Sequence, residues 1–168
     1  MVGRDSVYGA SAALDGGIAL NDAIVQFQGD ASILEVADLR AATERSVGFR
    51  TRLIRHEQAI LVQCQQTGAC IAFHTAECRL SGWLLRMRDL SGSDTLPLTQ
   101  EFLAQMIGVR RNAVSLVANT LQRAGFIRYR RGSIAITNVA GLQKGACECY
   151  GTVKSQYDRL LRDDENMA

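Results

Sequence analysis

The sequence is short of the features that define several large classes of protein. No apolar run approaches the roughly 18 residues that a membrane-spanning helix needs. The first residues also lack a basic and then apolar pattern, because Arg4 and Asp5 are followed by small and polar residues. We therefore expect a cytoplasmic protein with no secretory signal and no membrane segment.

Signatures of catalysis are missing as well. The chain has no nucleophile–base constellation, no phosphate-binding loop and no metal-binding motif. The two histidines, His56 and His74, are assigned to predicted helices, and we expect neither to have a partner carboxylate. We interpret His74, where one helix is predicted to give way to the next, as a hydrogen-bonding residue of a hinge. The sequence predicts that the protein is not an enzyme and binds no cofactor.

Cysteine is present in a number and spacing that do not indicate a disulfide framework. The count is five, an odd number, which is typical of a reducing compartment. Cys64, Cys70 and Cys78 have five and seven residues between them, and Cys147 and Cys149 flank one glutamate. Neither spacing is usual for zinc or for an iron–sulfur cluster. We predict no metal ligands and interpret the cysteines as small buried hydrophobic residues, with a metal or redox role as the alternative.

Charge is unevenly distributed, although the net charge is only +2. Residues 1–46 hold three basic and seven acidic residues, which gives −4, whereas residues 97–136 hold six arginines and a single glutamate, which gives +5. A basic block on a near-neutral chain is typical of a polyanion-binding surface. The alternative is an ordinary solvated surface, but these charges coincide with a predicted turn and hairpin.

The basic block lies in residues 98–136, whose pattern predicts a helix-turn-helix followed by a hairpin. Thr99 is placed to cap the first helix, and Gly108 follows it, where a left-handed residue ends a helix and turns the chain. The second helix, about 110–124, begins with Arg-Arg-Asn, in the turn that enters the major groove of DNA. The predicted inward-facing residues are Phe102, Leu103, Met106 and Ile107 in the first helix, and Val114, Val117, Ala118 and Leu121 in the second.

Residues 126–136 are predicted to form a wing, with a strand, a tight turn at Arg131-Gly132 and a returning strand. Apolar and basic residues alternate along the first strand. One face should therefore pack on the core, and the other, with Arg128 and Arg130, should face phosphate.

The segment from residue 1 to 46 is predicted to hold short strands. Residues 23–27 and 32–36 are β-like runs separated by a turn signal, and Asp38 is placed to cap a short helix, 39–45. Strands this few cannot bury much surface alone, so we expect the segment either to pack on something else or to be the end of a larger β-domain whose beginning is missing.

Residues 48–73 are predicted to form one long helix with two apolar stripes. One stripe should pack on the N-terminal segment and the other on a twin helix in a homodimer; the alternative is a core helix in a monomer. The stripes are Leu53 and Ile60 on one side, and Ile54, Leu61, Cys64 and Ile71 on the other.

The remaining elements are predicted from capping residues and periodicity. Thr75 is placed to cap a helix over 76–89, and Asn138 caps one that reaches Gly145. A last amphipathic helix spans about 150–161.

From about residue 60 to 161 the chain resembles the Crp/Fnr family of bacterial transcription regulators. The strings that carry the resemblance are Ala69-Cys70 with His74, Arg79-Leu80 with Trp83-Leu84-Leu85, LTQEFLA at 98–104, GVRR at 108–111, RRG at 130–132 and CECY at 147–150. The resemblance implies a cyclic-nucleotide-binding-type β-roll, a long dimerisation helix and a winged helix, in a dimer that binds a pseudo-palindromic operator.

These observations predict a mainly α fold with small β elements (α+β). We assign residues 1–46 to a remnant of the β-roll, 47–74 to the dimerisation helix, 75–150 to the winged helix-turn-helix and 151–168 to a C-terminal helix and tail. The front of the chain departs from the family, because only the last part of the β-roll is matched; the chain reads as a fragment, a misassigned start or a natural short form. No arginine–serine pair of the kind that holds a cyclic phosphate occurs in residues 9–17, so a cyclic nucleotide is not expected.

The resemblance also assigns DNA contacts to individual residues. Arg111 matches the family position that reaches guanine, and a bidentate arginine–guanine pair contributes about 1–3 kcal/mol of discrimination. Asn112 can read adenine, and Arg110 and Ser115 face the same groove. The candidates for backbone contacts are Thr99, Gln100, Arg128, Arg130 and Arg131.

The sequence therefore predicts a homodimeric, sequence-specific regulator of transcription that binds double-stranded DNA, with RNA polymerase as a further candidate partner. Two alternatives stay open. One is a ligand- or redox-sensing module in which DNA binding is secondary. The other is a short partner that heterodimerises with a full-length relative through the long helix.

Overall fold

The structure is a computed structural model, which describes residues 1–3, 6–14, 17–19, 21–130 and 132–161. The chain divides into two compact units, Met1–Val62 with Ser155–Ala168, and Gln63–Lys154. Helices α3 (Val47–Phe73) and α8 (Glu148–Leu161) contribute residues to both units. No helix in the described ranges is both long enough and apolar enough to cross a lipid bilayer.

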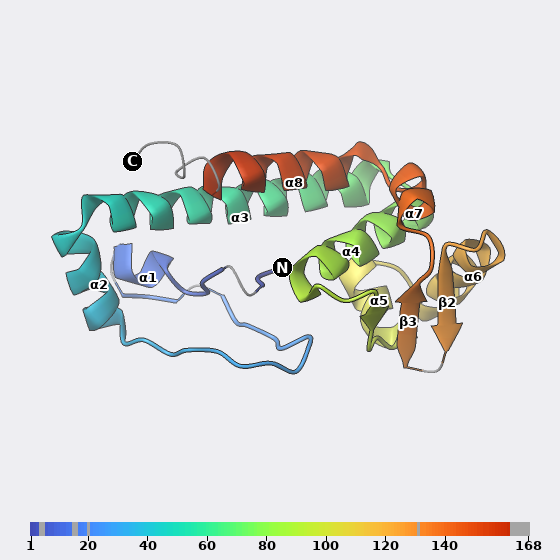
Figure 1. Ribbon diagram of the computed structural model, residues 1–168, viewed down its shortest axis with the longest axis horizontal. Helices are drawn as coiled ribbons and strands as arrows, with labels where there is room; N and C mark the ends of the chain where they lie inside the picture. The colour runs from blue at the N-terminus through green and yellow to red at the C-terminus, as the bar shows by residue number, and fades with distance from the viewer. Residues whose placement is uncertain (4–5, 15–16, 20, 131, 162–168) are drawn as a thin grey trace. The chain divides into compact units, whose positions relative to one another are not determined.

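The second unit, Gln63–Lys154, contains a small sheet and a set of short helices (Figure 1). Strands β1, β3 and β2 lie side by side in that order, and both pairs are antiparallel. The elements that lie wholly in this unit are α4 (Ala76–Ser91), β1 (Thr95–Leu96), α5 (Gln100–Ile107), α6 (Arg111–Arg123), β2 (Ile127–Arg130), β3 (Ser133–Ile136) and α7 (Val139–Gly145). The predicted helix-turn-helix, hairpin and flanking helices are thus confirmed.

Local chemistry explains where these helices begin. The hydroxyl oxygen of Thr75 accepts a hydrogen bond from the Cys78 amide, and that of Thr99 accepts one from the Phe102 amide at 3.2 Å. The Asn138 side chain accepts from the Gly141 amide at 2.8 Å. Each bond satisfies an amide that the helix itself leaves without a partner.

The predicted core of this unit is also confirmed. Leu103, Ile107, Val114, Ala118 and Leu121 are buried, and Phe102, Met106 and Val117 are half-buried. Trp83 meets Phe102 edge to face, with ring centroids 6.1 Å apart. Packing of α4 behind α5 and α6 fixes the two helices that carry the predicted DNA contacts.

The first unit is a small helical assembly. Helix α1 (Ser11–Leu14) packs against α2 (Val36–Arg45), and the buried positions are mostly small residues. Helix α3 begins after Ser46, whose hydroxyl accepts a hydrogen bond from the Phe49 amide at 3.2 Å. Arg52 donates to the carbonyl oxygen of Leu161 at 3.3 Å, which joins α3 to the end of α8 within this unit. The prediction of one long helix over 48–73 is confirmed to within one residue.

Two predictions for residues 1–46 are wrong. Residues 23–27 and 32–36 form no strands, and the described residues of this segment contain none. Their apolar side chains face outward, and Ile33 is 94% exposed; a β-like run needs a neighbouring strand, which these residues do not find. Asp38 does not cap a helix, because α2 begins at Val36; the carboxylate lies in the first turn, where it interacts favourably with the helix dipole.

Candidate nucleic-acid interface

The N-terminus of α6 presents three exposed polar side chains. Arg110 occupies the N-cap position with an extended backbone, but its side chain makes no capping hydrogen bond. Arg111 and Asn112 follow in the first turn, and all three are exposed. The first turn contains no acidic residue. Positive side chains at the positive end of a helix dipole are unfavourable in isolation, so this arrangement suits a surface that receives an anion.

A hydrogen bond connects the two helices of the helix-turn-helix. The Ser115 hydroxyl in α6 donates to Oε1 of Gln100, the first residue of α5, at 2.8 Å. The structure thereby brings together a predicted base-reading residue and a predicted backbone contact. The bond uses the amide oxygen of Gln100, so the NH2 group retains the donors that a phosphate oxygen requires. Thr99 is exposed and caps α5, so the start of this helix presents both side chains.

The wing follows the predicted alternation. Ile127 is buried and Tyr129 is half-buried, whereas Arg128 and Arg130 are exposed. The Tyr129 amide donates to Oε1 of Gln122 at 2.8 Å, which fixes β2 to the last turns of α6. Arg131, also predicted to contact the DNA backbone, lies outside the described residues.

Leu116 is a candidate that the sequence reasoning missed. It lies beside Ser115 on α6 and is 70% exposed. An exposed leucine on a recognition helix can contact the methyl group of thymine. The signal was present in the sequence, because the inward-facing periodicity of α6 leaves Leu116 off the buried face.

The two apolar stripes of α3 differ in exposure. Leu53 is buried and Ile60 is half-buried, in agreement with a stripe that packs within the chain. The second stripe is exposed throughout and consists of Ile54, Leu61, Cys64 and Ile71.

All five cysteines lie in the part of the chain that the structure describes. The interpretation of them as small buried residues is wrong for four of them. Cys149 is buried, Cys64 is exposed, and Cys70, Cys78 and Cys147 are half-buried.

The expectation that the histidines lack carboxylate partners is also wrong. His56 Nδ1 lies 3.5 Å from Oε1 of Glu57, and His74 Nε2 lies 3.3 Å from Oε1 of Glu148. The Glu148 contact joins residues far apart in the sequence, which spacing along the chain does not reveal.

Comparisons with known proteins agree with this geometry. Residues 78–144 match the model of the Crp-like helix-turn-helix domain. This match covers α5, α6 and the wing, the elements that carry the exposed arginines. No curated protein sequence matches the chain at a significant level.

Several solved structures are similar to this chain. FixK2 from Bradyrhizobium japonicum is 19% identical with a TM-score of 0.61, over 68% of this chain and 60% of FixK2. A CRP-family transcriptional regulator from Thermus thermophilus, TTHB099, is 20% identical with a TM-score of 0.50, over 69% and 56% of the two chains. A Crp/Fnr-family transcriptional regulator from Eubacterium rectale is 18% identical with a TM-score of 0.50, over 64% and 50%.

The alignments span at most 60% of the length of these three proteins. This chain carries a Crp-like helix-turn-helix domain and, over 64–69% of its length, shares the fold of these regulators of the Crp/Fnr family.

Proposed function

We propose that this protein is a sequence-specific DNA-binding regulator of transcription that acts in the cytoplasm as a homodimer on a pseudo-palindromic operator. The observation that carries the proposal is the exposed basic N-terminus of α6. In a helix-turn-helix, this turn of the second helix reads base edges in the major groove. The match to the Crp-like domain over 78–144 supports the proposal.

The proposed roles follow from position and chemistry. Residues 110–124 enter the major groove, where Arg111 donates two hydrogen bonds to guanine and Asn112 pairs with adenine. Arg110 and Ser115 lie beside them and contact base edges in the same groove. The wing, residues 126–136, lies on the DNA backbone. The proposed backbone contacts are Thr99, Gln100, Arg128, Arg130 and Arg131.

The exposed stripe of α3 supports a dimer. Its four apolar residues recur at intervals of seven, three and seven, which is the spacing of the seam between two helices. A two-fold axis along this seam would place two copies of α6 on two half-sites, about 34 Å apart on one face of the duplex. The proposed operator is therefore palindromic, with half-sites one helical turn apart.

Selection of bound sequences from random duplex DNA tests this function. We expect a palindromic consensus and an affinity that falls steeply with salt, because binding releases counterions from phosphates. Arg111→Ala should weaken binding to the selected operator by about 10-fold or more, from the loss of a bidentate contact worth roughly 1–3 kcal/mol. Arg123→Ala, an exposed arginine in the last turn of the same helix, is the matched control.

The proposed function fails if Arg111→Ala binds the selected operator as tightly as the parent protein. It also fails if the selection returns no common sequence. A further contradicting result is that Arg111→Ala and Arg123→Ala weaken binding by the same factor, both on the selected operator and on random duplexes. The last result would mean that the arginines supply only charge.

A further inference from the structure

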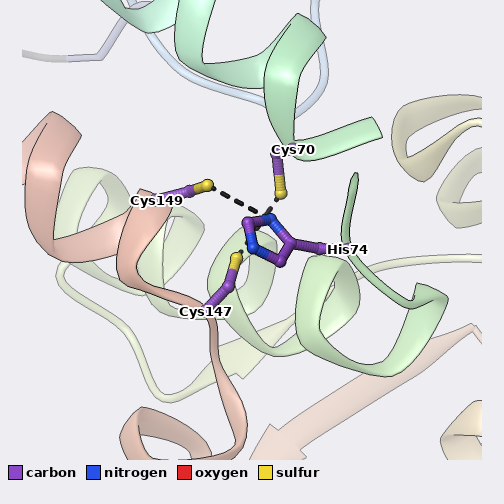
Figure 2. Close-up of side chains that lie close together, drawn as sticks. All are labelled: Cys70, His74, Cys147 and Cys149. Carbon is purple, nitrogen blue, oxygen red and sulfur yellow. Dashed lines mark hydrogen bonds between the residues drawn. The ribbon is translucent and has the colours of Figure 1, made fainter. Parts of the chain in front are cut away.

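Four side chains with metal-binding atoms converge in the second unit. They come from three places in the chain: Cys70 from the last turn of α3, His74 from the link between α3 and α4, and Cys147 and Cys149 from the start of α8. Figure 2 shows the three thiols grouped around the imidazole ring. Their ligand atoms all lie within 4.8 Å of one another. The closest pairs are Cys70 Sγ with Cys147 Sγ, at 3.5 Å, and Cys149 Sγ with His74 Nδ1, at 3.4 Å.

Local structure explains how the two short motifs meet. The His74 amide bonds to the carbonyl oxygen of Cys70 at 3.0 Å, so the last helical turn of α3 places the two side chains on one side. Cys147 precedes the first residue of α8 and Cys149 is its second residue, so the pair straddles the start of a helix. The contacts join residues 75 and 77 positions apart in the sequence.

The surrounding side chains orient these ligand atoms. Glu148 Oε1 lies 3.3 Å from His74 Nε2, on the opposite side of the ring from Cys149. A carboxylate that accepts a hydrogen bond from Nε2–H favours the tautomer in which the lone pair of Nδ1 is directed at the thiols. Gln66 Nε2 donates to Cys149 Sγ at 3.1 Å. The Cys-Glu-Cys sequence therefore supplies two sulfur ligands and, between them, the carboxylate that positions the imidazole.

The electrostatics of the group oppose its ionisation while no cation is present. Burial raises the pKa of the Cys70 thiol, and the neighbouring thiols of Cys147 and Cys149 raise it further. Burial also raises the pKa of Cys147. A cation at the centre of the group would reverse this effect, because it stabilises thiolates directly.

We propose that Cys70, His74 through Nδ1, Cys147 and Cys149 bind one Zn²⁺ ion in a closed tetrahedral site. Three thiolates and an imidazole are a ligand set that zinc takes in structural sites, and four protein ligands leave no open position for a reacting water. Zinc–ligand bonds of about 2.0–2.3 Å place tetrahedral ligands roughly 3.5–3.8 Å apart, close to the shortest contacts of the group. The ion would cross-link the end of α3 to the start of α8. This proposal does not depend on DNA binding.

The test uses the full chain, purified under reducing conditions without chelators. We expect about one Zn²⁺ per chain, and Co²⁺ in its place should give the intense visible absorption of a tetrahedral thiolate complex. Cys70→Ser and Cys149→Ser should lose the ion and this absorption. Cys64→Ser and Cys78→Ser are the matched controls, because neither thiol belongs to the group, and both should retain them.

A second pair of variants tests the orienting carboxylate. Glu148→Gln should weaken Zn²⁺ binding by about 10- to 100-fold, as loss of a partner to a metal-bound histidine does. Glu77→Gln, in the first turn of α4, should leave it unchanged. Because these variants keep all four ligands, they test the site even if the cysteine variants fold poorly.

Three results would overturn the proposal. One is the absence of stoichiometric Zn²⁺ binding by the reduced parent protein. Another is an equal loss of metal in the ligand variants and the Cys64 and Cys78 controls. The third is a disulfide between Cys70 and Cys147 that persists in reducing buffer and blocks Zn²⁺ binding, as identified by mass spectrometry.

Discussion

At the scale of single residues, Arg110 illustrates a conflict between stability and binding. Its backbone has the extended conformation of an N-cap, yet its side chain cannot accept a hydrogen bond from the first amides of α6. Serine at this position would accept one and would remove a positive charge from the positive end of the helix dipole. Arg110 therefore weakens the helix that it begins, and its proposed contact with DNA accounts for an arginine at this position.

We predict that Arg110→Ser raises the free energy of unfolding by about 0.5–2 kcal/mol and weakens operator binding. Urea denaturation and binding titrations at several salt concentrations measure the two effects. Arg123→Ser is the comparison, because a basic residue in the last turn favours the helix dipole and its loss should not stabilise the fold. An Arg110→Ser protein with unchanged stability and unchanged affinity would contradict this interpretation.

Single residues also show why the sequence predicts the helix boundaries of the helix-turn-helix but not the contacts of the cysteines. The positions of Thr99, Gly108 and Arg110 follow from capping and from helical periodicity, which are local properties. Cys70 and Cys147 meet only because the whole domain between them folds. Spacing along the chain carries no information about such a contact.

At the scale of elements, the packing of α7 depends on one glycine. A methyl group at Gly141 would lie 2.5 Å from two ring carbons of Phe126 and 3.1 Å from Cγ of Asn138. Phe126 precedes β2, and Asn138 caps α7, so this close approach sets the path of the chain after the wing. The sequence pattern predicts the helix and its cap at Asn138, but the contact with Phe126 is a tertiary feature that periodicity does not encode.

We predict that Gly141→Ala lowers the free energy of unfolding by about 1–3 kcal/mol, because the added methyl group must displace a packed ring. Gly151→Ala in α8 is the control: nothing lies within 4 Å of the added carbon, and alanine should stabilise that helix by about 0.5–1 kcal/mol. Thermal or urea unfolding distinguishes the two variants. Equal stability of Gly141→Ala and the parent would show that Phe126 moves aside without cost.

The sheet shows the same division between local and non-local information. Pairing of β2 with β3 was predictable, because only two residues separate the two short strands in the sequence. Residues 23–27 have a similar β-like composition but pair with no strand, and they remain irregular. Whether a short apolar run becomes a strand is decided by what lies beside it.

At the scale of the whole molecule, the proposed dimer accounts for the exposed stripe of α3. Leu61 belongs to this stripe and is 57% exposed in the single chain, as a residue of a dimer seam is before its partner covers it. We predict that Leu61→Glu shifts the protein from dimer to monomer, since two buried charges would face each other across the seam, and that operator affinity falls with it. Analytical ultracentrifugation measures the mass, with Thr51→Glu, at an exposed position outside the stripe, as the control.

A parent protein that is monomeric at micromolar concentration would contradict the homodimer. The same stripe would then be open to a full-length relative, and mixed complexes would form at equal ratio. Retention of the dimer by Leu61→Glu would place the interface elsewhere.

The convergence of Cys70 with Cys147 has a topological consequence for the domain between them. Their sulfur atoms lie 3.5 Å apart, so the chain leaves the end of α3 and returns to the start of α8 at nearly the same point. The intervening residues, 71–146, therefore begin and end beside one another. A cross-link at that point would close them into a single loop, which lowers the conformational entropy of the unfolded chain without adding a contact to the folded one.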